Sequence, residues 1–145
     1  MNGRPVLKFK LISPLAKIPS YAHDTDAGFD IYSIEQVSLL PRDRVVVKTG
    51  ISSEIPDGWY IQFFSKSGLA AKSGVSVLGG VIDSGYRGEW GIILINVGNE
   101  KVVIGEGDKI CQGVFLPIMR PEIEQVAEVG ESERGEGNFG STGKQ

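Results

Sequence analysis

The alternation of apolar and polar positions predicts short β-strands along most of the chain. Alternating, β-branched or aromatic runs occur at 7–11, 45–47, 59–64, 90–97 and 109–118. Gly, Pro, Asn and Asp clusters bound these runs and mark turns. The one convincing helical turn is Ser67 to Lys72, which Gly74 closes. Strands separated by turns at roughly ten-residue intervals are typical of a sandwich, barrel or jelly roll, so we predict an all-β fold.

Composition narrows the class of protein. A chain of 145 residues with 41% hydrophobic and 23% charged residues suits one domain with a real core. Twenty glycines and seven prolines argue against a helical bundle. The net charge of −3 shows no excess of basic residues of the kind that binds a nucleic-acid backbone. A phosphate-bearing ligand must therefore be bound by a local cluster of basic residues, by backbone amides or by a metal ion.

Single cysteine and histidine residues exclude two further kinds of site. Cys111 alone cannot form an intramolecular disulfide, and His23 alone cannot form a paired-histidine metal centre. Lys8 and Lys10 interrupt the N-terminal apolar residues, so we expect no signal peptide. No apolar run reaches about 18 residues. We expect an intracellular protein, cytoplasmic or nuclear, with no nucleic-acid or membrane partner.

The C-terminal residues differ in composition from the rest. We predict a β-domain over 1–129 and a flexible arm over 130–145, because a segment so rich in glycine cannot form its own core. The arm could be an unstructured tail, or it could order on a ligand. Arg134, Phe139 and two hydroxyl side chains among glycines would suit a phosphate and a planar base.

Chemically active side chains gather in further short segments at 26–30, 65–70, 79–89 and 107–112. The segment 79–89 predicts a hairpin. Each segment alone has an ordinary structural explanation. Asp30 could be a turn residue, Lys66 a solvated side chain, Tyr86 a half-buried aromatic residue and Gln112 a polar strand position.

In this order the segments resemble the motifs of the trimeric dUTPase family, the deoxyuridine triphosphate nucleotidohydrolases. The most specific matches are Gly80-Val81-Ile82-Asp83 followed by 86–89, and Arg134-Gly135 followed by 139–143. The resemblance implies a jelly-roll-like β-barrel with one short helix, assembled as a homotrimer. It also implies that the arm of one subunit closes over a site built by the others.

The resemblance implies hydrolysis of dUTP to dUMP and pyrophosphate with Mg²⁺, which would keep uracil out of DNA and supply dUMP for dTMP synthesis. Asp83 would activate the water that attacks the α-phosphorus, a role that suits a carboxylate ionised at neutral pH. Gln112 would help to place that water and the α-phosphate. Asp30 would hold the metal through water.

Substrate binding is implied for residues of three motifs and the arm. These residues are Lys66, Ser67, Gly68, Gly80, Val81, Ile82, Tyr86, Arg134, Phe139, Gly140, Ser141 and Thr142. Tyr86 would pack against the deoxyribose and reject UTP, and the backbone around Gly80 would pair with uracil. Arg134 would bind the γ-phosphate, and Phe139 would cover the base.

Three positions depart from the family pattern, and two other functions remain open. Lys66 stands where arginine is usual and loses the bidentate fork, Cys111 replaces a small alanine, and Asn138 replaces glycine. A dCTP deaminase-like or bifunctional enzyme would share the fold. So would a regulatory protein whose binding surface is gated by nucleotide.

Overall fold

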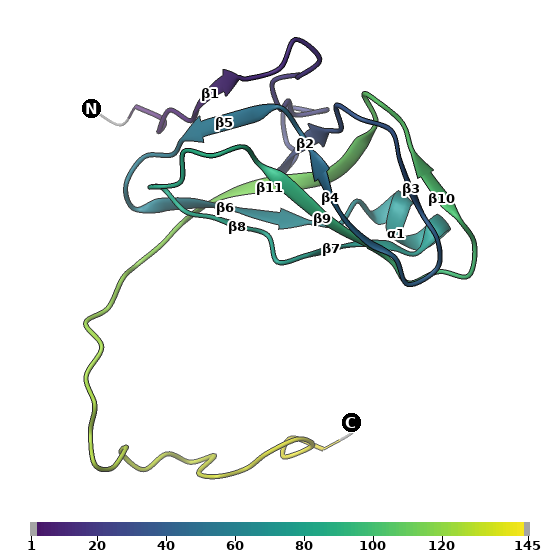
Figure 1. Cartoon of the computed structure of the whole chain (residues 1–145). Coiled ribbons are helices and arrows are strands. Elements are labelled where there is room, and N and C mark those ends of the chain that lie inside the picture. Colours follow the sequence, from purple (N-terminus) through teal and green to yellow (C-terminus); the bar gives the residue numbers. More distant parts are fainter. Residues whose placement is uncertain (1–2, 144–145) are drawn as a thin grey trace.

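The computed structural model describes residues 3–143, and its regular elements are almost all antiparallel β-strands (Figure 1). One sheet contains β2 (Gly28–Tyr32), β11 (Lys109–Pro117), β6 (Trp59–Phe64) and β8 (Val81–Ile82) in that order. A second contains β4 (Arg44–Lys48), β9 (Gly91–Asn96) and β7 (Val75–Leu78). Two-stranded ribbons pair β1 (Lys8–Leu11) with β5 (Ile51–Glu54) and β3 (Val37–Leu39) with β10 (Val102–Ile104).

The prediction of an all-β fold with one short helix is confirmed, and the arrangement is consistent with a jelly roll. The helix α1 (Ser67–Ser73) ends at Gly74, whose left-handed φ of 67° closes the last turn. The prediction of a hairpin at 79–89 is wrong, because the strands at its two ends do not pair with each other. β8 pairs with β6, whereas β9 pairs with β4 and β7, so the segment crosses between two sheets.

The core is centred on Trp90, which is fully buried. Rings of Phe9 and Phe63 lie 5.1 Å and 5.4 Å from it, centroid to centroid. The indole Nε1 donates a hydrogen bond to Oγ of Ser53, so burial leaves no unpaired donor on this ring. The strict alternation of buried and half-buried positions along β9 places Ile92 and Leu94 in the same core. The buried positions of the alternating pattern therefore meet in one apolar interior.

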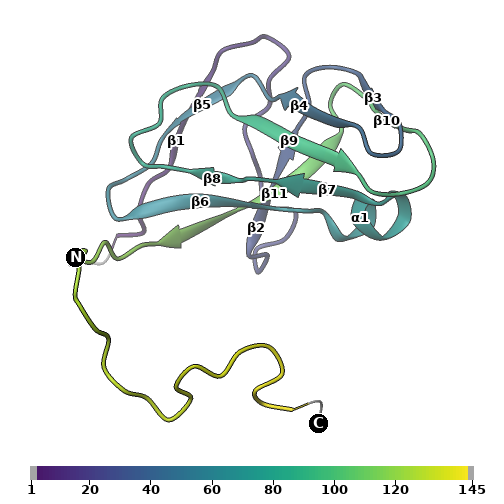
Figure 2. The ribbon, with the colours of Figure 1, turned by 60° about the horizontal axis from the view of Figure 1, so that its bottom comes forward.

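Regular structure ends well before the C-terminus. The last strand ends at Pro117, and residues 118–143 contain neither helix nor strand and are exposed throughout. Both ribbon views show this segment leaving the body of the molecule (Figures 1 and 2). The exposed segment therefore begins earlier than the arm expected at 130–145. No helix among residues 3–143 is long and apolar enough to cross a membrane.

Candidate active site

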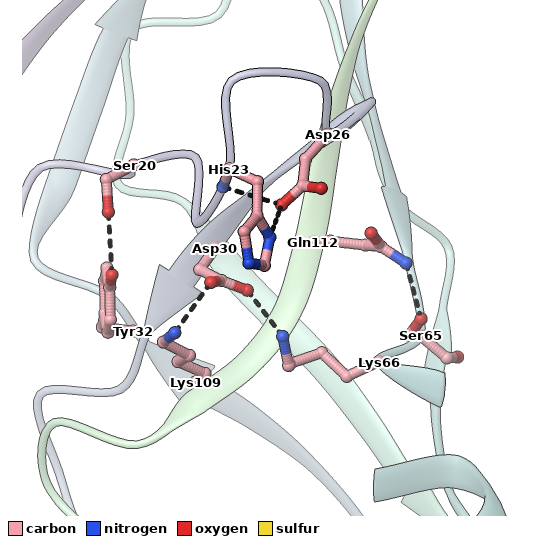
Figure 3. A network of polar contacts seen from close by, with 9 residues as sticks. All are labelled: Ser20, His23, Asp26, Asp30, Tyr32, Ser65, Lys66, Lys109 and Gln112. Carbon is pink, nitrogen blue, oxygen red and sulfur yellow. Dashed lines mark hydrogen bonds and ion pairs between the residues drawn. The ribbon is translucent and has the colours of Figure 1, made fainter. Parts of the chain in front are cut away.

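Asp30 is a buried carboxylate on β2 that pairs with two lysines (Figure 3). Its Oδ1 lies 2.6 Å from Nζ of Lys66, and its Oδ2 lies 3.0 Å from Nζ of Lys109. Burial is the largest single influence on the pKa of Asp30 and raises it. The lysine hydrogen bonds and charges together outweigh burial, so this pKa lies below its ordinary value. The cluster has two ammonium groups for one carboxylate and can attract an anion.

Gln112 is placed beside this cluster by strand register. It lies directly opposite Asp30 across the β2–β11 pair, so the two side chains share a face. Its Nε2 donates to the carbonyl oxygen of Ser65 at 3.1 Å, as Figure 3 shows. Gly28 makes room for this side chain, because a Cβ there would come within 2.5 Å of Oε1 of Gln112. Sequence reasoning assigned no role to Gly28.

Lys109 was also missed, and a β-bulge explains why. Side chains alternate along a strand, so Lys109 and Gln112, three positions apart, should face opposite sides. The register shifts between Lys109 and Cys111, which is a bulge, and the shift brings Lys109 to the face of Asp30. The hydrogen bond and charge of Asp30 raise the pKa of Lys109. An isolated Gly-Asp-Lys turn carries no sequence signal for such a bulge.

The start of α1 completes this first group. Lys66 has an extended backbone at the N-cap and makes no side-chain capping bond. Its ammonium group donates a hydrogen bond to Asp30 instead. Ser67 and Gly68 follow and are exposed. The N–H groups of a first helical turn have no intrahelical acceptor and can bind an oxyanion beside Lys66.

The loop 83–89 forms a second group. Asp83 is exposed directly after β8, and Tyr86 lines with it a small hollow of about 150 Å³. The side chain of Val81 is exposed, whereas that of Ile82 lies in the core. Gly80 has a φ of 109°, and its carbonyl accepts a hydrogen bond from the N–H of Phe63 at 2.8 Å.

These two groups are separated within one chain. The loop between β8 and β9 lies at the opposite end of the molecule from α1 in both ribbon views (Figures 1 and 2). The strand register explains the separation, because β8 runs back along β6 away from Ser65. One copy of the chain thus does not bring Asp83 to Lys66.

The arm carries the third group of candidate residues. Arg134, Ser141 and Thr142 line one hollow of about 550 Å³ within the arm, and Phe139 is completely exposed. Gly140 has a φ of 82°, a left-handed conformation that favours glycine. Asn138 does not adopt a positive φ, so replacing the usual glycine there imposes no backbone strain.

A magnesium ion fits this chain only in part. No group of three or more His, Cys, Asp or Glu side chains among residues 3–143 could hold a metal ion. Both oxygens of Asp30 already contact lysine ammonium groups. Mg²⁺ prefers oxygen ligands, keeps several waters and is commonly held by substrate phosphates. The donor set therefore fits an ion that substrate phosphates carry better than one held by the protein's own side chains.

Comparison with known protein families shows to which family the chain belongs. The dUTPase family model matches residues 15–143. The chain belongs to the dUTPase family. The deoxyuridine 5'-triphosphate nucleotidohydrolase of Clostridium tetani is 50% identical over 140 residues, which cover 95% of this chain and 97% of that protein. That of Clostridium novyi is 48% identical over 130 residues, covering 88% and 92%.

Solved dUTPase structures share the fold. A mutant dUTPase of Staphylococcus bacteriophage 80alpha with dUpNHpp superposes with a TM-score of 0.89 at 35% identity, covering 95% of this chain and 98% of that one. A mutant dUTPase from phage phi11 of S. aureus, described with a structural Mg(II) ion, gives 0.81 at 33% identity, covering 87% and 99%. The 80alpha enzyme is also described as controlling transfer of virulence genes by a G protein-like mechanism.

Proposed function

We propose that this protein hydrolyses dUTP to dUMP and pyrophosphate. The observation that carries the proposal is the cluster of Asp30, Lys66 and Lys109 beside Gln112, which offers excess positive charge and an amide at one end of a dUTPase fold. A triphosphate needs such a local cluster because the whole chain has a net charge of −3. Bound dUpNHpp in the related phage enzyme supports the same ligand class.

The phosphate chain would lie at the first group of residues. Lys66 and Lys109 neutralise phosphate charge, and Ser67 with the N–H of Gly68 donates hydrogen bonds to phosphate oxygens. Gln112 orients the α-phosphate and the attacking water. Asp30 holds Lys66 and Lys109 in place and would hold Mg²⁺ through water. When bound, Mg²⁺ neutralises charge on the phosphate oxygens.

Asp83 would act as the general base. Its carboxylate accepts a proton from water as the water oxygen bonds to the α-phosphorus, and the bond to the bridging oxygen of pyrophosphate breaks. The exposure of Asp83 at the end of β8 leaves it accessible to a substrate bridging two subunits. The backbone around Gly80, Val81 and Ile82 pairs with uracil, and Tyr86 packs against the deoxyribose.

We infer a homotrimer with shared sites from the separation of these groups. The start of α1 and the loop between β8 and β9 lie at opposite ends of one chain, so a complete site needs a second copy. The exposed arm is free to reach a further copy. Its Arg134 would bind the γ-phosphate, with Gly140, Ser141 and Thr142 around the terminal phosphates, and Phe139 would cover the base. We keep the predicted division into a β-domain over 1–129 and an arm over 130–145 as part of this proposal.

An oxygen-label experiment tests the chemistry. In ¹⁸O water with Mg²⁺, attack at the α-phosphorus places the label in dUMP, whereas attack at the β-phosphorus places it in pyrophosphate. We expect label in dUMP alone. Asp83→Asn should abolish turnover, and Asp24→Asn, which changes another exposed carboxylate, should not. Label in pyrophosphate, or an active Asp83→Asn enzyme, would contradict the assignment.

A regulatory role is a second candidate, favoured by the description of the related phage 80alpha enzyme. Nucleotide that orders the exposed arm would change the surface presented to a partner. A partner retained by the protein with dUpNHpp and released without it would support this role. Binding that ignores the nucleotide would refute it.

A further inference from the structure

The ring of Tyr86 is held in one position by its own loop. Its Oη donates a hydrogen bond to the carbonyl oxygen of Glu89 at 2.8 Å. The ring also rests on Gly88: a Cβ at that residue would come within 2.5 Å of Oη and 2.7 Å of Cζ. Tyr86 remains 43% exposed, so packing against the core constrains its ring only in part. These two neighbours contribute to its orientation.

Glu89 is in turn fixed to the body of the molecule. Its Oε1 accepts a hydrogen bond from the N–H of Gly50 at 2.9 Å. The next residue, Trp90, is fully buried, and its N–H donates to the carbonyl of Ile51 at 2.8 Å. Thr49 adds a hydrogen bond from Oγ1 to the carbonyl of Trp90 at 2.6 Å. The carbonyl that holds Tyr86 therefore belongs to a residue anchored by its side chain and by its neighbour.

We propose that Gly88 and Glu89 are positioning residues that determine sugar specificity. They hold the Tyr86 ring against the hollow that it lines with Asp83, so that the ring cannot retreat from a ribose 2′-hydroxyl. A hydrophobic pocket rejects a ligand that merely adds a hydroxyl only weakly. A ring that cannot move aside strengthens this rejection, because it leaves no space for the added hydroxyl. This inference rests on the proposed function, because it assumes that Tyr86 faces the deoxyribose.

Gly88→Ala tests the inference with little risk to folding. The new methyl group meets the far end of an exposed ring, and the φ of Gly88 is not left-handed, so alanine suits its backbone. Gly85→Ala is the matched control, since a Cβ there meets nothing within 4 Å. The methyl displaces Oη of Tyr86 from the carbonyl of Glu89, so we expect Gly88→Ala to change the ratio of kcat/KM for dUTP to that for UTP about tenfold or more, and Gly85→Ala to leave it unchanged.

The two substrates separate a positioning role from general damage. A displaced ring changes the two kcat/KM values unequally, whereas a damaged fold lowers both alike. If the wild type is active and Gly88→Ala leaves the ratio unchanged, the inference is overturned and the proposed function is not. A wild-type protein that does not hydrolyse dUTP would overturn the proposed function and this inference with it.

Glu89 gives an independent comparison. Glu89→Gln keeps an oxygen that can accept from Gly50, whereas Glu89→Ala removes it. Glu89→Ala loosens the anchor, so we expect it to lower the dUTP-to-UTP ratio about tenfold and Glu89→Gln to restore most of it. Equal ratios in Glu89→Ala and the wild type would show that the anchor does not act through Tyr86.

Discussion

Replacing Asp30 by asparagine removes the charge that Lys66 and Lys109 share. The contact with Lys66 has the larger effect on stability, because these side chains are only 9% and 30% exposed. A hydrogen bond between charged groups contributes roughly 1.5–3 kcal/mol, and removing one partner leaves the other poorly solvated. We therefore expect Asp30→Asn to lower the free energy of unfolding by about 2 kcal/mol at pH 7. Lys109 is more exposed and adds less.

The pH dependence of this effect follows from the sign of the pKa shift. The pKa of Asp30 in the folded protein is lower than its ordinary value of 3.8. Its stabilising effect is therefore fully present above the unfolded pKa and is lost as the pH falls through the folded pKa. The difference between wild type and Asp30→Asn should be constant above about pH 5 and shrink below about pH 4.

Urea unfolding at several pH values measures this difference. Both proteins must be compared at one protein concentration, because subunit association contributes to stability. Asp24→Asn is the control, since it neutralises an exposed carboxylate in the preceding loop. Equal stability of Asp30→Asn and the wild type at pH 7 would refute the reasoning, and so would a difference that persists undiminished at pH 3.

Three further predictions concern turnover. Ending the chain after residue 133 should leave a trimer by light scattering but lower kcat about a hundredfold or more, because the lid and its positioning contacts are lost; full activity would contradict a closing arm. Gly28→Ala should push Gln112 out of place and lower kcat about tenfold, unlike Gly3→Ala, and an unchanged rate would show that the placement of Gln112 is unimportant. EDTA should stop pyrophosphate release reversibly while the melting temperature stays nearly constant, because residues 3–143 contain no metal-binding cluster of their own; a large fall in melting temperature would reveal a structural metal.

The long strands were predictable because each carries an uninterrupted apolar or alternating pattern. β6, β9 and β11 fall within the predicted runs. The short strand β10 was missed, because three residues cannot establish a period. The hairpin prediction failed because turn residues at Gly79 and Gly80 fix a change of direction but not the partner strand.

Candidate residues were predictable from motif chemistry, but their geometry was not. The pairing of Asp30 with Lys66 joins residues 36 positions apart and depends on tertiary structure. Lys109 depends on a bulge, and Gly28 matters only because Gln112 lies opposite this part of β2. The departure at Asn138 causes no backbone strain, because its φ is not positive, and the sequence could not show this.

A substrate panel tests the central claim most directly. The purified protein with Mg²⁺ would be offered dUTP, dCTP, dTTP and UTP, and pyrophosphate and ammonia would both be assayed. Release of pyrophosphate from dUTP alone, without ammonia, is the result expected of a dUTP diphosphatase. Ammonia from dCTP, or no pyrophosphate from dUTP, would contradict the proposed function.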